Sequence, residues 1–381
     1  MPPPLPTELL ETIFRYATSA GVDPHLGITH AKHEAHWFVK FKKDNLEKME
    51  IKIALTRVSR RFRRIALEFL FEFVSIDNPH QAERLVKMMK EEPSSSELRP
   101  RERIKFLFVT FPNIPLVTEI LRLCRGLRGF WWNPHDTQTR PQNWEAAQDE
   151  MIQTIPTNLR FLHWNAEVPF EIFTTFLQKA SASLQIISAS RIRAHRLLQH
   201  RLPRASYPCL THLHFDHLSL FVWLQSVTWE IPSLIEVNLS GLHSGGELQR
   251  CFRHAGKSLR VLRLGRNVRL MPSFLSHILD ACASLEELYY HTDGYLDDTP
   301  LWHSDVAHMK MQKVAIYAPM AKHMAISMLQ HYFGPISKTR FPSLDNVIIC
   351  DISGGPLIPN HYSVLMRRVS EDFHSAEISE M

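Results

Sequence analysis

The sequence predicts an α/β protein: a small all-α module at the N-terminus, followed by an irregular solenoid of repeats with a curved parallel sheet inside and helices outside. Three observations support this prediction. Two amphipathic helical patterns lie within the first 71 residues. From residue 104 onward, one apolar spacing recurs at intervals of about 25 residues. The 381 residues, 44% apolar and 22% charged, are typical of a globular chain with two or three packed units.

The first predicted helix lies in the segment PPPLPTELLETIFRYA. Prolines precede it, and Glu8 and Glu11 fall near its positive end, as is usual where a helix starts. Its apolar residues recur three and four positions apart, so they share one face. These residues are Leu9 or Leu10, Ile13, Phe14 and Ala17.

A second helix is predicted over Ala54 to Phe71, ALTRVSRRFRRIALEFLF. One narrow face carries its apolar residues, Leu55, Val58, Phe62, Ile65 and Phe69. The rest of the circumference carries five arginines, Arg57, Arg60, Arg61, Arg63 and Arg64. A protein that binds a nucleic acid backbone normally adds interleaved aromatics or a second basic strip, and the net charge of +5 is mild. We therefore predict no nucleic acid partner.

Hexamers that are apolar at the first, fourth and sixth positions follow. From Leu159 their first positions advance by 25, 26, 24, 25, 26 and 26 residues, and intervals of 32 before Leu159 and 33 before Leu344 imply inserted loops. The hexamers are IKFLFV from Ile104, LRGFWW from Leu127, LRFLHW from Leu159, LQIISA from Leu184, LTHLHF from Leu210, LIEVNL from Leu234, LRVLRL from Leu259, LEELYY from Leu285, MQKVAI from Met311 and LDNVII from Leu344.

Each hexamer is expected to form a short strand, whose fourth and sixth residues point into a core and whose first residue anchors the preceding turn. Segments of helical spacing lie between the hexamers, among them VPFEIFTTFLQKA and SFLSHILDACA. One strand and one helix cannot cover their own apolar faces, so such units stack and share a core. The alternative is an ordinary α/β domain with coincidental spacing.

This period and leucine spacing resemble the leucine-rich repeat family over roughly residues 100 to 355. The family's usual asparagine occurs at Asn267, whereas the equivalent positions elsewhere include Leu218, Leu242 and Asp293, so the repeats are degenerate. On a strand of this kind the third, fifth and seventh residues face outward, onto a concave surface. Aromatic residues mixed with Arg and His are typical of protein recognition surfaces.

We therefore predict that a target protein binds to these outward residues. The alternative is that some of them, such as Phe161 or Tyr289, pack under a loop. The outward set is Trp131, Phe161, His163, His212, His214, Asp216, Arg263, Glu287, Tyr289, His291 and Tyr317.

The N-terminal pattern LPxELLxxIF, followed by LxxVSRRFRxIA and closing with Phe71 and Val74, resembles the F-box. This resemblance implies docking on a Skp-family adaptor, and through it on a cullin ligase, while the repeats select an unknown protein substrate. The chain departs from the family in the long segment 21–53 between the two helices. The alternative is a helical hairpin that only caps the first repeat. The implied adaptor residues are Leu5, Pro6, Leu9, Leu10, Ile13, Phe14, Leu55, Val58, Phe62 and Ile65.

Catalytic and metal sites find little support in the sequence. His30, His33 and His36 recur at three, which splays the outer two by about 120° on a helix, and HEAH is not the HExxH motif. Asp297 and Asp298 are adjacent and are interpreted as turn residues. No phosphate-binding loop, dinucleotide fingerprint or nucleophile elbow occurs. We predict a non-enzymatic protein without cofactor or metal; a hydrolase with a histidine metal site stays the alternative.

Cysteine usage and hydropathy bear on location. The five cysteines lie at least 31 positions apart, without a CxxC pair, which favours a reducing compartment. No apolar stretch approaches the roughly 18 residues of a membrane span. We therefore expect an intracellular protein, cytoplasmic and/or nuclear, with no membrane partner.

The predicted organisation has four parts. Residues 1–80 form an F-box-like module with an inserted loop at about 21–53, and residues 81–103 connect this module to the solenoid. The solenoid spans residues 104–360, and residues 361–381 form a polar tail. Together these predict the substrate-recognition subunit of an SCF-type ubiquitin ligase. The alternative is a leucine-rich-repeat scaffold whose F-box-like segment is only a cap.

Overall fold

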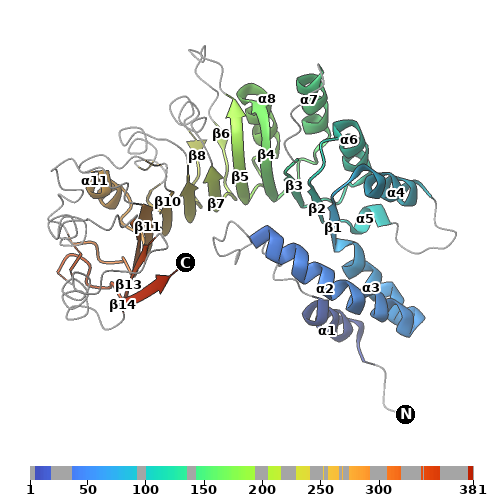
Figure 1. The fold of residues 1–381 in the computed structure, drawn as a ribbon, viewed down its shortest axis with the longest axis horizontal. Coiled ribbons are helices and arrows are strands. Elements are labelled where there is room, and N and C mark those ends of the chain that lie inside the picture. Colours follow the sequence, from blue (N-terminus) through green and yellow to red (C-terminus); the bar gives the residue numbers. More distant parts are fainter. Residues whose placement is uncertain are drawn as a thin grey trace. The chain divides into compact units, whose positions relative to one another are not determined.

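The chain divides into two compact units, Met1–Ile187 (unit 1) and Ser188–Met381 (unit 2). Figure 1 shows the ribbon of the computed structural model. The structure describes residues 5–18, 37–91, 100–134, 143–193, 205–215, 229–240, 252, 256–265, 268, 274–291, 307–318, 336–337, 339–351 and 376–380.

Unit 1 begins with a helical module of α1 (Thr7–Thr18), α2 (Trp37–Val58) and α3 (Arg60–Glu72). The ring of Phe14 meets the rings of Phe62 and Phe69 edge-on, with centroids 5.0 and 6.3 Å away. Burying these apolar side chains stabilises the three helices together. The module core contains Leu10, Phe14, Ile65, Ala66 and Phe69, with Leu55 and Phe62 packed against it.

The prediction of a single helix over Ala54 to Phe71 is wrong, because the helix is interrupted at Ser59. Ser59 is extended (φ −160°, ψ 167°), and its Oγ accepts a hydrogen bond from the N–H of Phe62 at 3.1 Å. It thus caps the start of α3. Residues 37–53, predicted as part of an inserted loop, form most of α2 instead. Residues 21–36 of that predicted loop lie outside the described residues.

The repeats of unit 1 begin earlier than predicted. The first strand, β1 (Phe73–Ile76), pairs in parallel with β2 (Phe106–Val109), with Phe73 opposite Phe106. The predicted connection 81–103 holds most of α4 (Pro79–Lys90) and all of α5 (Pro100–Arg103). The remaining strands follow in chain order: β3 (Gly129–Trp132), β4 (Phe161–Pro169) and β5 (Ile186–Arg193), of which only Ile186 and Ile187 belong to unit 1.

One face of this sheet is covered by a row of helices (Figure 1). Neighbouring members of this row pack side by side. The segment VPFEIFTTFLQKA was predicted to be helical, and α8 confirms this. Besides α4, the row contains α6 (Ile114–Leu123), α7 (Trp144–Thr154) and α8 (Phe170–Ala180).

Unit 2 continues the same design. Its strands pair in parallel with their neighbours in the order β7, β9, β10, β11, β12, β13, β14. Helix α11 (Phe274–Ala281) confirms the helix predicted in SFLSHILDACA, and β14 shows that the predicted polar tail, 361–381, includes a strand. The strands are β7 (His212–Phe215), β9 (Glu236–Leu239), β10 (Val261–Leu264), β11 (Glu287–His291), β12 (Lys313–Ala318), β13 (Asn346–Asp351) and β14 (Ala376–Glu380). A two-stranded sheet pairs β6 (Ala205–Ser206) with β8 (Trp229–Glu230).

The predicted hexamer pattern is confirmed. Wherever burial is described, the first, fourth and sixth residues of every hexamer are buried, for example Leu259, Leu262 and Leu264. A repeated hydrogen bond joins the coils: the N–H groups of Arg260 and Val261 both donate to the carbonyl of Ile235, at 2.8 and 3.0 Å. The apolar spacing therefore reflects buried positions that recur at the same place in each coil.

A serine just before several hexamers adds a second link that the sequence analysis did not predict. Ser183 Oγ lies 2.8 Å from the carbonyl oxygens of both Thr157 and Leu159, which share its single hydroxyl hydrogen. Ser233 Oγ donates to the carbonyl of Pro208 at 2.8 Å, and Ser343 Oγ to that of Met309 at 2.6 Å. Each bond satisfies a turn carbonyl of the preceding coil, where the backbone lacks a strand partner.

Candidate functional site

The helical module leaves an apolar surface exposed, although its own core is complete. We call this surface the module face. Leu10, Phe14 and Ile65 of the predicted adaptor set are buried in the module core, and Leu55 and Phe62 are half-buried. Pro6 is exposed. The module face consists of Leu5 (51% exposed), Leu9 (51%), Ile13 (50%), Tyr16 (82%) and Val58 (62%).

Polar contacts hold α1 against α3 and so fix the module face. Arg61 Nη2 donates to the carbonyl of Leu5 at 2.6 Å and lies 3.1 Å from Thr7 Oγ1. At the other end of α1, Arg15 Nη1 lies 3.6 Å from a carboxylate oxygen of Glu72. Tyr16, which the sequence analysis left out, follows Ile13 by three positions and Leu9 by seven. That spacing puts it on the same face and could have identified it.

A buried lysine lies inside the module. Lys52 is 1% exposed, and its Nζ donates to Asn45 Oδ1 at 2.8 Å and lies 5.7 Å from the centre of the Phe73 ring. Burial lowers the pKa of Lys52 to about 8, although the carboxylate of Glu72 opposes the change. Burial also raises the pKa of Glu72 above its ordinary value, against the opposing effect of Arg15.

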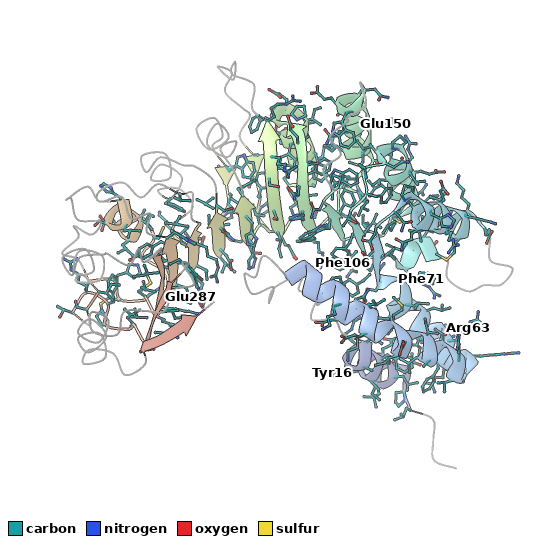
Figure 2. The ribbon with its side chains drawn as sticks, in the orientation of Figure 1. Tyr16, Arg63, Phe71, Phe106, Glu150 and Glu287 are labelled. Atoms are coloured by element: carbon teal, nitrogen blue, oxygen red, sulfur yellow. The ribbon has the colours of Figure 1, made fainter. Side chains whose placement is uncertain are left out.

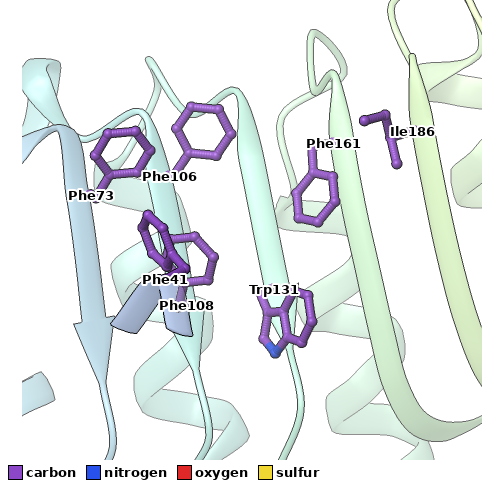
Figure 3. Packing of buried hydrophobic residues seen from close by; sticks show 7 residues of the cluster. All are labelled: Phe41, Phe73, Phe106, Phe108, Trp131, Phe161 and Ile186. Atoms are coloured by element: carbon purple, nitrogen blue, oxygen red, sulfur yellow. The ribbon is translucent and has the colours of Figure 1, made fainter. Parts of the chain in front are cut away.

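The outward face of the unit 1 sheet is apolar and covered. Phe41 of α2 lies on it, with its ring centroid 4.9 Å from that of Phe108 and 5.4 Å from that of Phe73 (Figure 3). Trp131, predicted to bind a target, is only 6% exposed and lies in the same cluster. That prediction is corrected: Trp131 packs within the protein. The cluster contains Phe41, Phe73, Phe106, Phe108, Trp131, Phe161 and Ile186.

The ring of Trp131 also stacks on His163, with centroids 3.4 Å apart and planes 11° from parallel. His163 is half-buried. Of the three outward residues predicted in unit 1, Trp131, Phe161 and His163, it is therefore the one that stays partly accessible. Phe161 is 4% exposed, which supports the alternative that it packs within the fold and does not contact a target.

In unit 2 the outward face is polar and centres on Arg263. Its Nε donates to a Glu236 oxygen at 3.3 Å, its Nη2 lies 3.9 Å from a Glu287 oxygen, and its guanidinium carbon lies 3.6 Å above the Tyr289 ring. Lys313 Nζ lies 5.3 Å from the centre of that ring. The strands β9, β10, β11 and β12 therefore carry alternating charges that hold one another in place. Figure 2 labels Glu287 within unit 2.

Tyr289 is the buried part of this network, at 8% exposed. Its hydroxyl donates to Glu287 at 2.5 Å. Burial and that hydrogen bond raise the pKa of Tyr289 to about 12, so the hydroxyl stays protonated at neutral pH. The alternative that Tyr289 packs within the fold is therefore supported, because its ring is buried beneath Arg263 and does not face solvent.

Histidines flank the network. His214 Nε2 lies 3.6 Å from a Glu236 oxygen, and His212 Nδ1 lies 2.8 Å from Thr211 Oγ1. His291 stacks on Tyr317, with centroids 4.6 Å apart. The three histidines and Tyr317 are half-buried. The structure therefore gathers His212, His214, Arg263, Glu287, Tyr289, His291 and Tyr317 onto the outward face of β7, β10, β11 and β12.

This outward face can form hydrogen bonds, ion pairs and stacking contacts. Burial raises the pKa of the thiols of Cys124 and Cys282 to about 12, so neither supplies a thiolate at neutral pH. Within the described ranges, no group of three His, Cys, Asp or Glu side chains could hold a metal ion. Nor does any helix there combine the length and hydropathy needed to cross a membrane. His30, His33, His36, Asp216, Asn267, Asp297 and Asp298 lie outside the described residues.

Comparison with known proteins identifies no family. No family model and no curated protein sequence matches the chain. Among solved structures, the chain is similar to one from a crystal structure of the complex of Rad7 and Elc1 in yeast. The similarity covers 93% of this chain and 91% of that chain, at 10% sequence identity and a TM-score of 0.38. At that level it does not establish a shared fold, so the F-box resemblance stays a prediction.

Proposed function

We propose that the protein is the substrate-recognition subunit of an SCF-type ubiquitin ligase. Its module face binds a Skp-family adaptor, and through that adaptor a cullin ligase, while its repeats bind a protein target. The protein is not itself an enzyme: it brings its target close to a separate enzyme that transfers ubiquitin, which raises the effective concentration of the reacting groups. It needs no cofactor for this role.

The observation that carries the proposal is the exposed module face. Leu9, Ile13 and Val58 are at least half exposed, whereas Leu10, Phe14 and Ile65 already fill the module core. Packing of the three helices does not need the exposed set. Exposed apolar residues grouped in this way are typical of a protein interface. They are also residues of the F-box-like pattern, which supports an adaptor as the partner.

Target binding is proposed for the outward face of unit 2. Arg263 and Glu287 are already fixed by their neighbours, so the ordering cost of binding is reduced. His163 of unit 1 stays a predicted target residue, whereas Trp131 does not. The intracellular location, cytoplasmic and/or nuclear, is part of the same proposal.

The test is a pulldown of the full chain with a purified Skp-family adaptor. Leu9→Asp and Val58→Asp place charge on the module face, and because both side chains are exposed, circular dichroism should show a retained fold. Leu46→Asp is the matched control, since Leu46 is 71% exposed on α2 but lies about 120° around the helix from Val58. We expect the wild type and Leu46→Asp to bind, and the other two variants not to bind.

The second candidate function is a repeat scaffold whose module only caps the first coil. The close packing of Phe41 of α2 on Phe73 and Phe108 favours it, because a cap must contact the first strands. A folded wild type that fails to bind the adaptor would leave this function in front of the ligase proposal.

A further inference from the structure

Helix α3 starts with a concentration of positive charge that its own stability does not favour. Its first five positions hold Arg60, Arg61, Arg63 and Arg64, and its first turn has no acidic residue. The N-terminal end of a helix is positive, so cations there are unfavourable. Like charges three and four positions apart, as between Arg60 and either Arg63 or Arg64, also repel.

Arg61 has a structural role that the others lack. Its guanidinium donates to the carbonyl of Leu5 and to Thr7 and so joins α3 to α1. Arg60, Arg63 and Arg64 are exposed, and none of them forms an ion pair or side-chain hydrogen bond with the described residues. We call these three residues the arginine face.

The arginine face lies opposite the buried side of α3. Ile65, Ala66 and Phe69 point into the module core, and at about 100° per residue Arg60, Arg63 and Arg64 fall on the other side of the helix. Figure 2 shows Arg63 at the end of α3 that lies away from the sheet, well apart from Tyr16. The arginine face is thus turned away from the module core, and only its first member, Arg60, lies near the module face, two positions after Val58.

We propose that the arginine face binds an acidic segment of a partner protein. Guanidinium groups bind carboxylates through paired N–H donors, and the positive end of α3 adds to the attraction for an anion. The surface extends over about 6 Å of helix, which suits a short acidic run. Residues that oppose local stability without compensation are expected at functional sites.

A protein segment is favoured over a nucleic acid for two reasons. No aromatic residue on α3 is exposed, because Phe69 is buried and Phe62 and Phe71 are half-buried, so no base could stack there. The net charge of +5 is also mild for a protein that follows a phosphate backbone. This inference does not depend on adaptor binding by the module face.

The experiment measures fluorescence anisotropy of a labelled peptide of about ten glutamates with the full chain, at low salt where charge interactions are least screened. A labelled single-stranded thymidine oligonucleotide of the same charge is the second probe. The variant is Arg60→Gln/Arg64→Gln. The matched control, Arg84→Gln/Lys87→Gln, removes the same charge from exposed positions of α4.

We expect the wild type and the control to bind the peptide more tightly than the oligonucleotide. The variant should bind the peptide at least tenfold more weakly, and its thermal midpoint should equal or exceed that of the wild type, because the unfavourable charges at the helix start are reduced. A lower midpoint would overturn the premise that these charges oppose stability. No binding by the wild type, equal weakening in both double variants, or preference for the oligonucleotide would overturn the proposal.

Discussion

Lys52 allows a quantitative test of how α2 is held in unit 1. The pKa of Lys52 falls from its ordinary 10.5 to about 8, because its ammonium group is buried. Each pKa unit corresponds to about 1.4 kcal/mol, so keeping the charge buried costs about 3 kcal/mol at pH 7. Lys52→Met removes the charge but keeps the length of the side chain. It also leaves Asn45 Oδ1 without its partner, which costs about 1 kcal/mol. We therefore expect the variant to be about 2 kcal/mol more stable at pH 7.

The pH dependence follows from the direction of the pKa change. Between about pH 8 and 10.5 the unfolded chain keeps the proton on Lys52 while the folded chain has lost it. The stability of the wild type therefore rises with pH across that window, relative to the variant. The advantage of Lys52→Met should be largest below pH 8, and by about pH 10.5 it should reverse to a deficit of about 1 kcal/mol, because the neutral lysine no longer carries the cost of a buried charge but still donates to Asn45.

The assay is urea unfolding of wild type and variant, followed by circular dichroism from pH 7 to pH 10.5. Other lysines and tyrosines titrate in both proteins, so the quantity to compare is the difference in free energy of unfolding at each pH. Exposed Lys43→Met is the matched control, since its side chain is 75% exposed, and it should give no such trend. A difference that does not change with pH, or a Lys52→Met variant less stable at pH 7, would refute the reasoning.

Three further changes test other parts of the fold. Phe41→Ala should destabilise unit 1 by about 3 kcal/mol in urea unfolding, because Phe41 is 4% exposed against the sheet; a loss below about 1 kcal/mol would contradict that packing. Gly256→Ala should destabilise unit 2 by about 1 to 3 kcal/mol, since a Cβ there would lie 2.7 Å from the carbonyl oxygen of Ala281, and an unchanged thermal midpoint would argue against this crowding. Ser233→Ala should cost about 1 kcal/mol by losing its bond to the Pro208 carbonyl, whereas exposed Ser59→Thr, which keeps a capping hydroxyl, should cost much less.

The repeats were predictable because their signal is local and periodic. Alternation along a strand determines which side chains point inward, and stacking gives each coil the same neighbours. Leu262 and Leu213, each the fourth residue of its hexamer, are therefore buried in the same kind of environment. The break at Ser59 was missed for a related reason: the apolar spacing continues across it from Leu55 to Phe62. Serine is a favoured cap, so its side chain was the available signal.

Helix α2 could not be read from periodicity, because its buried residues mix apolar Phe41 with polar side chains. It buries Lys52 and Asn45 and exposes Leu46 and Ile53. A pattern of this kind looks irregular in the sequence, which led to the prediction of an inserted loop. The burial of Trp131 was hidden for a different reason. Alternation shows which face of the sheet a residue occupies, but not whether a distant segment such as Phe41 helps to cover that face.

The outward faces of the two units have different chemistry, and under the proposed function we expect them to have different roles. In unit 1 the outward strand positions Phe106, Phe108 and Phe161 are buried and apolar, so this part of the sheet is a packing surface for α2. In unit 2 the equivalent positions carry Arg263 and Glu287, whose side chains retain access to solvent. Charged groups held in place but still partly solvated suit a surface that binds and releases a partner. We therefore expect substitutions that weaken target binding to concentrate on the outward face of unit 2 and at His163, and those at Phe106, Phe108 and Phe161 of unit 1 to act through stability.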